Sequence, residues 1–111
     1  MVYSDTDIQI FHHPYFSLIR QTEKECELKS LNTGHYWKIV LKEDYCSLEH
    51  KHVAEEKYHH QTSFGTVELC LEEIANHDEY FCKKHELLNN YPDFFDHVVG
   101  KYKETSFIMS M

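Results

Sequence analysis

The stretch ECELKSLNTGHYWKIVL, residues 25–41, decides the fold of this chain. Apolar residues occupy alternate positions on both sides of a polar turn: Cys26, Leu28, Trp37, Ile39 and Leu41. This period of two is typical of a strand with one buried face. In the turn, Asn32 suits the first position and Gly34 supplies a positive φ at little steric cost. The stretch therefore predicts an antiparallel β-hairpin with one apolar face.

Further short strands are expected on both sides of this hairpin. Tyr15–Gln21 precedes it and Tyr45–His52 follows it, each across a short polar turn. Tyr58–Thr62 can pair back as a fifth strand. Near the amino end, a further short strand can form around Ile8–Phe11. A parallel pair needs a crossover of a dozen residues or more, so these short connections predict an antiparallel meander.

After Thr66 the apolar spacing changes from a strand period to a helical one. Thr66 suits a helix N-cap, and the apolar stripe that follows consists of Val67, Cys70, Leu71 and Ile74. Polar residues at 76–78 interrupt this stripe, so residues 66–88 form either one helix or two, with Asp78 capping the second. Pro92 fits the first turn of a last helix, roughly Pro92–Lys103.

Together these elements predict an α+β fold in a single domain of 111 residues. A four- to five-stranded antiparallel β-meander in residues 1–62 is followed by two or three helices in residues 63–104. The helices pack on one face of the sheet, and a short apolar tail, residues 105–111, ends the chain. One core is expected where the sheet meets the first of these helices: Leu28, Trp37, Leu48, Leu71 and Ile74.

The composition disfavours some classes of binding partner for this chain. The formal net charge is −8, and an acidic field repels phosphate backbones and anionic membranes, so nucleic acid is disfavoured. No run approaches the ~18 apolar residues of a membrane span, and the first residues do not resemble a signal peptide. Four spaced cysteines without a CxxC pair predict buried thiols in a reducing compartment. A cytoplasmic location is therefore expected.

The stretch LEHKHVAEEKYHH, residues 48–60, is rich in metal-ligating side chains. On a strand, His50 and His52 share one face about 7 Å apart, pointing the same way as Leu48. His60 from a returning strand and Glu56 from the loop complete a set that suits Zn, Fe or Ni. The alternative is a histidine-rich hairpin end whose rings only cap the core. We favour this second interpretation, so no cofactor is expected and a divalent metal is the alternative.

No catalytic motif is found, and catalysis is not expected. The favoured function is a small interaction or regulatory module that binds a protein partner or assembles with itself. Tyrosines on the nominally wet sheet face and the apolar tail are the interface or ligand candidates: Tyr15, Tyr36, Tyr45, Phe107 and Ile108.

Two other functions remain open. The first is a metal-dependent binding protein or enzyme built on the His-x-His strand. The second is a sheet that stacks single-stranded nucleic acid on Tyr36, Trp37 or Tyr45, which the net charge disfavours. Residues 12–14, His-His-Pro, form a loop that has side chains suited to contact a ligand.

Overall fold

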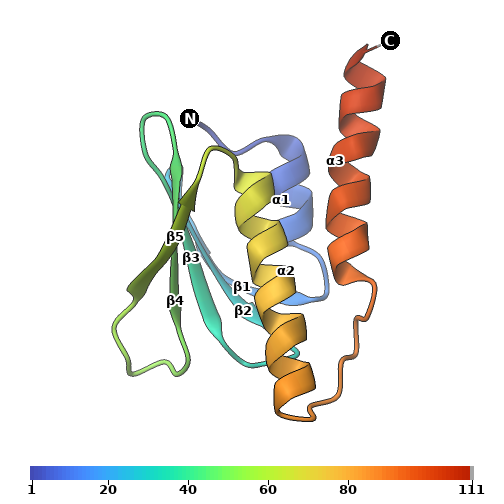
Figure 1. The fold of residues 1–111 in the computed structure, drawn as a ribbon. Helices are drawn as coiled ribbons and strands as arrows, with labels where there is room; N and C mark the ends of the chain where they lie inside the picture. The colour runs from blue at the N-terminus through green and yellow to red at the C-terminus, as the bar shows by residue number, and fades with distance from the viewer. Residues whose placement is uncertain (111) are drawn as a thin grey trace.

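A computed structural model describes the backbone of residues 1–110 and the side chains of residues 1–106. Five antiparallel strands form one sheet in the order in which they follow along the chain: β1 (Phe16–Gln21), β2 (Glu25–Ser30), β3 (Tyr36–Leu41), β4 (Cys46–Lys51) and β5 (His59–Phe64). The helices are α1 (Asp5–Phe11), α2 (Val67–Lys84) and α3 (Phe94–Ser110). Figure 1 shows all three helices on the same side of the sheet, with α3 farthest from it. The predicted α+β meander is confirmed.

The hairpin of β2 and β3 forms as the sequence predicts. Gly34 has a φ of 74°, and its N–H donates to the carbonyl of Ser30 at 2.8 Å. Leu28 pairs with Trp37, and buried and half-buried residues alternate along both strands. The positive φ of the turn is the reason for a glycine at this position.

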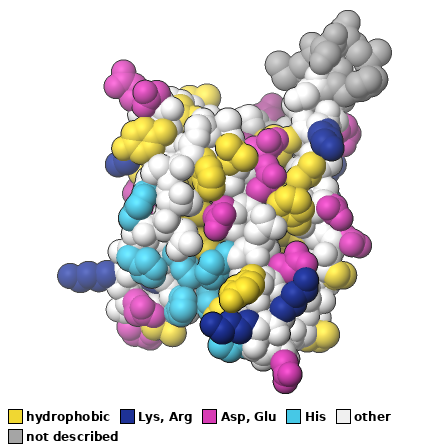
Figure 2. Space-filling view, viewed as in Figure 1, with side chains coloured by type: hydrophobic (Ala, Val, Ile, Leu, Met, Phe, Trp, Pro, Cys, Tyr) yellow, Lys and Arg dark blue, Asp and Glu magenta, His cyan; other side chains and the backbone are white. Residues whose placement is uncertain are grey.

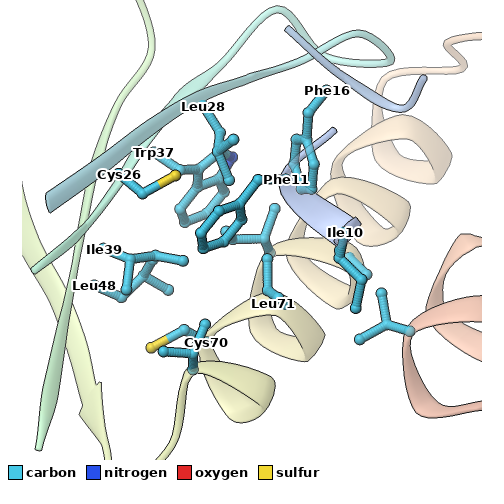
Figure 3. Close-up of a cluster of buried hydrophobic side chains, with 14 of the residues drawn as sticks. Ile10, Phe11, Phe16, Cys26, Leu28, Trp37, Ile39, Leu48, Cys70 and Leu71 are labelled. Atoms are coloured by element: carbon cyan, nitrogen blue, oxygen red, sulfur yellow. The ribbon is translucent and has the colours of Figure 1, made fainter. Parts of the chain in front are cut away.

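The core lies between the sheet and α2 (Figure 3). The five residues expected to meet there are all fully buried: Leu28, Trp37, Leu48, Leu71 and Ile74. The four cysteines are buried and unpaired, as expected. The alternating face of the sheet and the helical stripe of α2 therefore close on each other, and this contact is the centre of the fold.

The amino end differs from the expected short strand, because Ile8–Phe11 belongs to helix α1. A capping box starts this helix: the Ser4 hydroxyl accepts from the Asp7 N–H at 3.0 Å, and the Asp7 carboxylate accepts from the Ser4 N–H at 2.8 Å. The stretch Ile8–Phe11 is too short to distinguish the two-residue period of a strand from the 3.6-residue period of a helix. The cap, which satisfies two free backbone donors, decides for the helix.

Residues 66–84 form one capped helix rather than two. Thr66 is the N-cap, as expected, and its hydroxyl accepts from the Leu69 N–H at 3.2 Å. Asp78 caps nothing: its side chain is 1% exposed and accepts hydrogen bonds from Tyr15 at 2.5 Å and from Thr33 at 3.3 Å. Because these partners satisfy the carboxylate, the polar interruption of the stripe does not break the helix.

The carboxyl-terminal helix begins later and ends later than expected. It starts at Phe94, after Pro92, and continues to Ser110, so residues 105–110 of the expected tail are helical. A hydrogen bond from the Tyr102 hydroxyl to Asp7 ties α3 to α1. Within the described residues, no helix combines the length and the apolar character that a membrane crossing requires.

Replacing Leu71 with alanine tests the contact between α2 and the sheet. Leu71 has no exposed surface, so Leu71→Ala should lower the free energy of unfolding by about 2–5 kcal/mol. Leu69, on the same helix, is 41% exposed, and Leu69→Ala should change stability by less than about 0.5 kcal/mol. Denaturant titration measures both, and equal losses in the two variants would show that α2 does not cover the sheet through Leu71.

Candidate metal centre

The pairing of β3 with β4 brings histidines from two strands together. Trp37 pairs with His50 and Tyr36 with Lys51, so His35 and His52 are the next residues to meet. The rings of His35 and His52 are stacked, with centroids 4.2 Å apart and planes 9° apart. The ring of His50 stacks on Trp37 with centroids 4.0 Å apart. Side chains alternate along a strand, so all of these rings lie on the inner face of the sheet.

Helix α2 packs against this part of the inner sheet face. The ring of His77 lies 4.8 Å from that of His50, and Phe81 lies 4.4 Å from His35. We call His35, His50, His52 and His77 the histidine cluster. His59 on β5 lies at its margin, with its ring 5.6 Å from that of His50. Figure 2 shows a patch of histidine side chains on the surface at this end of the molecule, so the cluster extends from the core to solvent.

The nitrogen atoms of three of these residues converge. His50 Nε2 lies 3.3 Å from His35 Nδ1. With His52, the three side chains offer one nitrogen each within 4.8 Å of one another. In a tetrahedral zinc site with Zn–N bonds of 2.0–2.1 Å, ligand nitrogens lie about 3.3 Å apart. His35 and His50 already have this spacing, where their nitrogens form a hydrogen bond, and His52 has to turn out of its stack on His35 before its lone pair can reach the same ion.

Burial favours the neutral form of three imidazoles of the cluster, those of His35, His50 and His77. Burial, together with the neighbouring His77 and His35, lowers the pKa of His50 to about 3. Burial and the neighbouring His52 lower the pKa of His35 to about 4 and also lower the pKa of His77. A metal ion binds the lone pair of a neutral imidazole. Near pH 7, His35 and His50 therefore need to lose no proton to act as ligands.

One nitrogen of the cluster has no hydrogen-bond partner among the described residues. His77 Nδ1 is buried, and a carboxylate oxygen of Asp78 lies 4.0 Å away, beyond hydrogen-bond distance. A buried polar atom without a partner costs on the order of 1–3 kcal/mol unless a ligand satisfies it. His77 is not one of the three histidines whose nitrogens converge, so this atom is an unsatisfied polar group at the margin of the candidate site.

A second combination, His35, His77 and Asp78, also places its ligand atoms within 4.8 Å. Its carboxylate, however, is already engaged: Tyr15 donates to one oxygen and Thr33 to the other. Burial raises the pKa of Asp78 to about 6. An ion at this place would have to break an established hydrogen-bond network, so the three-histidine set is the better site.

Of the four expected metal ligands, the structure brings two together. His50 and His52 point to the core side with Leu48, as expected. His60 pairs with Glu49 on the outer face, where its Nδ1 lies 3.1 Å from the Ser47 hydroxyl. The register shifts between Leu48 and Glu49, so that the inward position opposite His50 belongs to His59 instead.

The fourth expected ligand, Glu56, is used by the hairpin loop. Its carboxylate accepts a hydrogen bond from the Val53 N–H at 3.2 Å, and the side chain stays exposed. His35 and His77 were missed. Pairing the predicted hairpin strands in sequence would have placed His35 opposite His52. His77 continues the inward stripe of Cys70 and Ile74, a signal that its polarity concealed.

The expected interface residues fall into three groups. Tyr15 is 2% exposed, so its assignment to the wet face was wrong: its ring stacks on Phe94 at 3.9 Å. Tyr36 is half-buried on the outer sheet face, and Tyr45 is 43% exposed. Phe107 and Ile108 have side chains outside the described residues. Trp37 has no exposed surface and therefore cannot stack a nucleobase.

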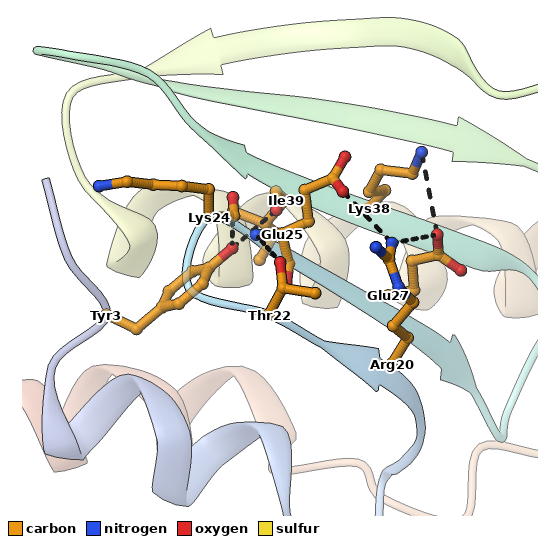
Figure 4. Close-up of polar contacts among 8 residues, drawn as sticks. All are labelled: Tyr3, Arg20, Thr22, Lys24, Glu25, Glu27, Lys38 and Ile39. Atoms are coloured by element: carbon orange, nitrogen blue, oxygen red, sulfur yellow. Dashed lines mark hydrogen bonds and ion pairs between the residues drawn. The ribbon is translucent and has the colours of Figure 1, made fainter.

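The outer face of the sheet is polar, as the alternation predicts. Figure 4 shows Glu27 between Arg20 and Lys38, each at 3.8 Å. The ammonium group of Lys51 lies over the rings of both Tyr58 and Tyr36, at 4.4 and 5.3 Å. Of these basic groups, Arg20 and Lys38 are paired with a carboxylate, which leaves less free positive charge on this face for a phosphate chain.

Comparisons with known proteins add no functional assignment. No protein-family model, no curated protein and no solved structure matches this chain. The function must therefore be inferred from the geometry of the site.

The neutral state of His50 makes a prediction about pH. An unfolded histidine takes up a proton near pH 6.5, whereas folded His50 stays neutral down to about 3. The stabilisation that comes from burying neutral His50 is therefore fully present above pH ~6.5 and is lost as the pH falls below this value. Between about pH 7 and pH 5, the wild type should lose about 1–2 kcal/mol more unfolding free energy than His50→Phe, which keeps a ring on Trp37.

Denaturant titration at the two pH values measures this difference. Asp78, whose raised pKa acts in the opposite direction, is present in both proteins and cancels from the comparison. Identical pH dependence in the wild type and in His50→Phe would contradict a neutral buried His50.

Proposed function

We propose that this domain binds one divalent transition-metal ion, Zn²⁺ being the best match, through His35, His50 and His52. The observation that supports this most strongly is the convergence of three imidazole nitrogens within 4.8 Å at the edge of the core. Imidazole is a preferred ligand of Zn²⁺, Cu²⁺ and Ni²⁺, and Zn²⁺ accepts a tetrahedral arrangement without electronic cost.

The surroundings of these residues support binding rather than simple capping of the core. The ring nitrogens of His50 and His35 are hydrogen-bonded to each other at 3.3 Å, which is also the spacing of two nitrogen ligands around one tetrahedral ion. The stack of His50 on Trp37, with ring centroids 4.0 Å apart, fixes the plane of the His50 ring. Fixed ring orientation is what the surroundings of a metal ligand supply, because it removes the entropy of ordering the ligand.

The position of the site suggests a structural or regulatory role for the ion. Three protein ligands would leave a fourth position for water or a further ligand, and the ring of His77 on α2 lies 4.8 Å from that of His50. His52 is exposed, so the ion can enter from solvent. Binding would join the ends of β3 and β4 beneath α2, and its free energy would add to that of folding. The four unpaired cysteines suit a reducing compartment such as the cytoplasm.

Metal analysis of protein purified without a histidine tag tests the proposal. After equilibration with Zn²⁺ and dialysis, we expect about one ion per chain, and His35→Ala, His50→Ala and His52→Ala should each lose it. His60→Ala is the matched control, because His60 lies on the opposite face and should leave the ion in place. At a free Zn²⁺ concentration 100 times the Kd, the wild type should gain about 2.7 kcal/mol of stability.

Two results would refute the metal site. One is a wild-type protein that holds no Zn²⁺, Cu²⁺ or Ni²⁺ and melts at the same temperature with and without a chelator. The other is loss of the ion in His60→Ala together with its retention in His52→Ala, which would place the site on the outer face.

A protein-interaction module is the second candidate function. It is supported by the outer sheet face, where Tyr36 and Tyr58 share the Lys51 ammonium and remain partly exposed. Tyrosine offers large contact area at low entropy cost, and a protein partner or a second copy of the chain would cover this face.

Sedimentation equilibrium tests the self-association that this candidate includes. We expect a mass above that of the monomer at high protein concentration, and Tyr36→Ala should reduce it toward the monomer. Tyr80→Ala is the control, because Tyr80 is 66% exposed on helix α2, away from the sheet. A monomer over a wide concentration range would remove self-assembly from the candidate.

A further inference from the structure

A second candidate site lies apart from the histidine cluster, where the loop after α1 meets the start of α3. A cavity of about 280 Å³ opens there, close to the lower limit of ordinary ligand pockets. Its walls come from residues 13 and 91–97: His13, Tyr91, Pro92, Asp93, Phe94 and His97. The volume accommodates one small molecule of one or two fused rings.

The aromatic walls of this cavity are fixed by the core behind them. Phe94 is buried and stacks on Tyr15 at 3.9 Å, and Tyr15 in turn is held by its hydrogen bond to Asp78. The ring of His13 lies 5.1 Å from Phe94 and 5.9 Å from Tyr91. Such a preformed set of flat faces favours a flat ligand, since little ordering remains to be done on binding.

His13 presents a hydrogen-bond donor whose tautomer the backbone decides. Its Nδ1 accepts the N–H of Tyr15 at 3.0 Å, so in the neutral ring the proton resides on Nε2. Burial and the neighbouring His97, whose ring lies 4.6 Å away, keep the pKa of His13 below its usual value. Among the described residues, no hydrogen bond engages His13 Nε2. This N–H is therefore available to an acceptor on a ligand.

Asp93 supplies a hydrogen-bond acceptor, whereas His13 supplies a donor. Its carboxylate is exposed at the rim, and no hydrogen bond or ion pair within the described part of the chain involves it. A carboxylate accepts hydrogen bonds only, so it selects a ligand with an N–H group. Together with Asp96 one turn along and the net charge of −8, it repels anions.

We propose that this cavity binds a small flat nitrogen heterocycle that carries an amino group next to a ring nitrogen, as a free base rather than a phosphorylated one. The ring packs against the aromatic wall, the ring nitrogen accepts from His13, and the amino group donates to Asp93. This inference is independent of the metal site, because the two sites share no residue.

Titration followed by NMR, with a chelator present to keep metal off the histidine cluster, tests the inference with adenine as the probe. Adenine at millimolar concentration should shift the resonances of Tyr91, Phe94 and His97. Purine, which has the same ring without the amino group, should bind about tenfold more weakly, since it lacks the hydrogen bond to a charged acceptor. Adenosine monophosphate should bind more weakly than adenosine, because its phosphate meets the acidic rim.

Two variants test whether Asp93 is the hydrogen-bond partner of the ligand's amino group. In Asp93→Asn, the preference for adenine over purine should fall well below tenfold, because a neutral amide oxygen replaces the charged acceptor. Asp96→Asn removes a like charge three residues further along, in the first turn of α3 and outside the cavity wall, and it should keep the preference. Both positions are exposed, so neither change threatens the fold.

Three outcomes would overturn the inference. The first is an absence of shifts at the cavity residues with adenine. The second is equal binding of adenine and purine by the wild type. The third is tighter binding of the monophosphate than of the nucleoside. If Asp93→Asn and Asp96→Asn reduced the preference equally, the contact with Asp93 would be wrong.

Discussion

The pairing of Trp37 with His50 is the constraint on which the rest of this structure depends. It fixes the register of β3 against β4, and side chains alternate with a period of two. With β3 in place, a slip of β4 by one residue would turn Leu48 and His50 to the solvent and remove their part of the apolar surface that α2 covers. The same slip would separate His35 from His52. The core and the candidate metal centre therefore come from one register.

The histidine cluster shows how a protein core can end in polar groups. Imidazole has a flat apolar face and two nitrogens, so it can continue the packing of Trp37 while it offers ligands at its edge. Burial keeps His35 and His50 neutral and limits the cost of placing them inside. Neutral imidazoles are also the form that a metal ion requires. The neutral state of these imidazoles thus serves both the stability of the core and the proposed metal binding.

Asp78 joins three parts of the chain that are distant in sequence. It receives hydrogen bonds from Tyr15, which precedes β1, and from Thr33, in the turn between β2 and β3, and it lies on α2. Tyr15 also supports Phe94 in the wall of the second cavity. The carboxylate therefore positions α2 over the histidine cluster and, through Tyr15, holds the start of α3. A buried charge of this kind is tolerated only because its hydrogen bonds are satisfied.

Local pattern determined the hairpin of residues 25–41, the meander and the start of α2 at Thr66, because alternation, turn chemistry and caps act over a few neighbouring residues. It also placed His50 and His52 on the core side. Only the tertiary structure decided that His35 and His77 join them while His60 and Glu56 do not. Those positions depend on strand register, on a bulge and on the packing of α2, which are long-range contacts. Tyr15 and Asp78 are buried for the same reason: each is stable inside only in the presence of the other, a partner 63 positions away in sequence.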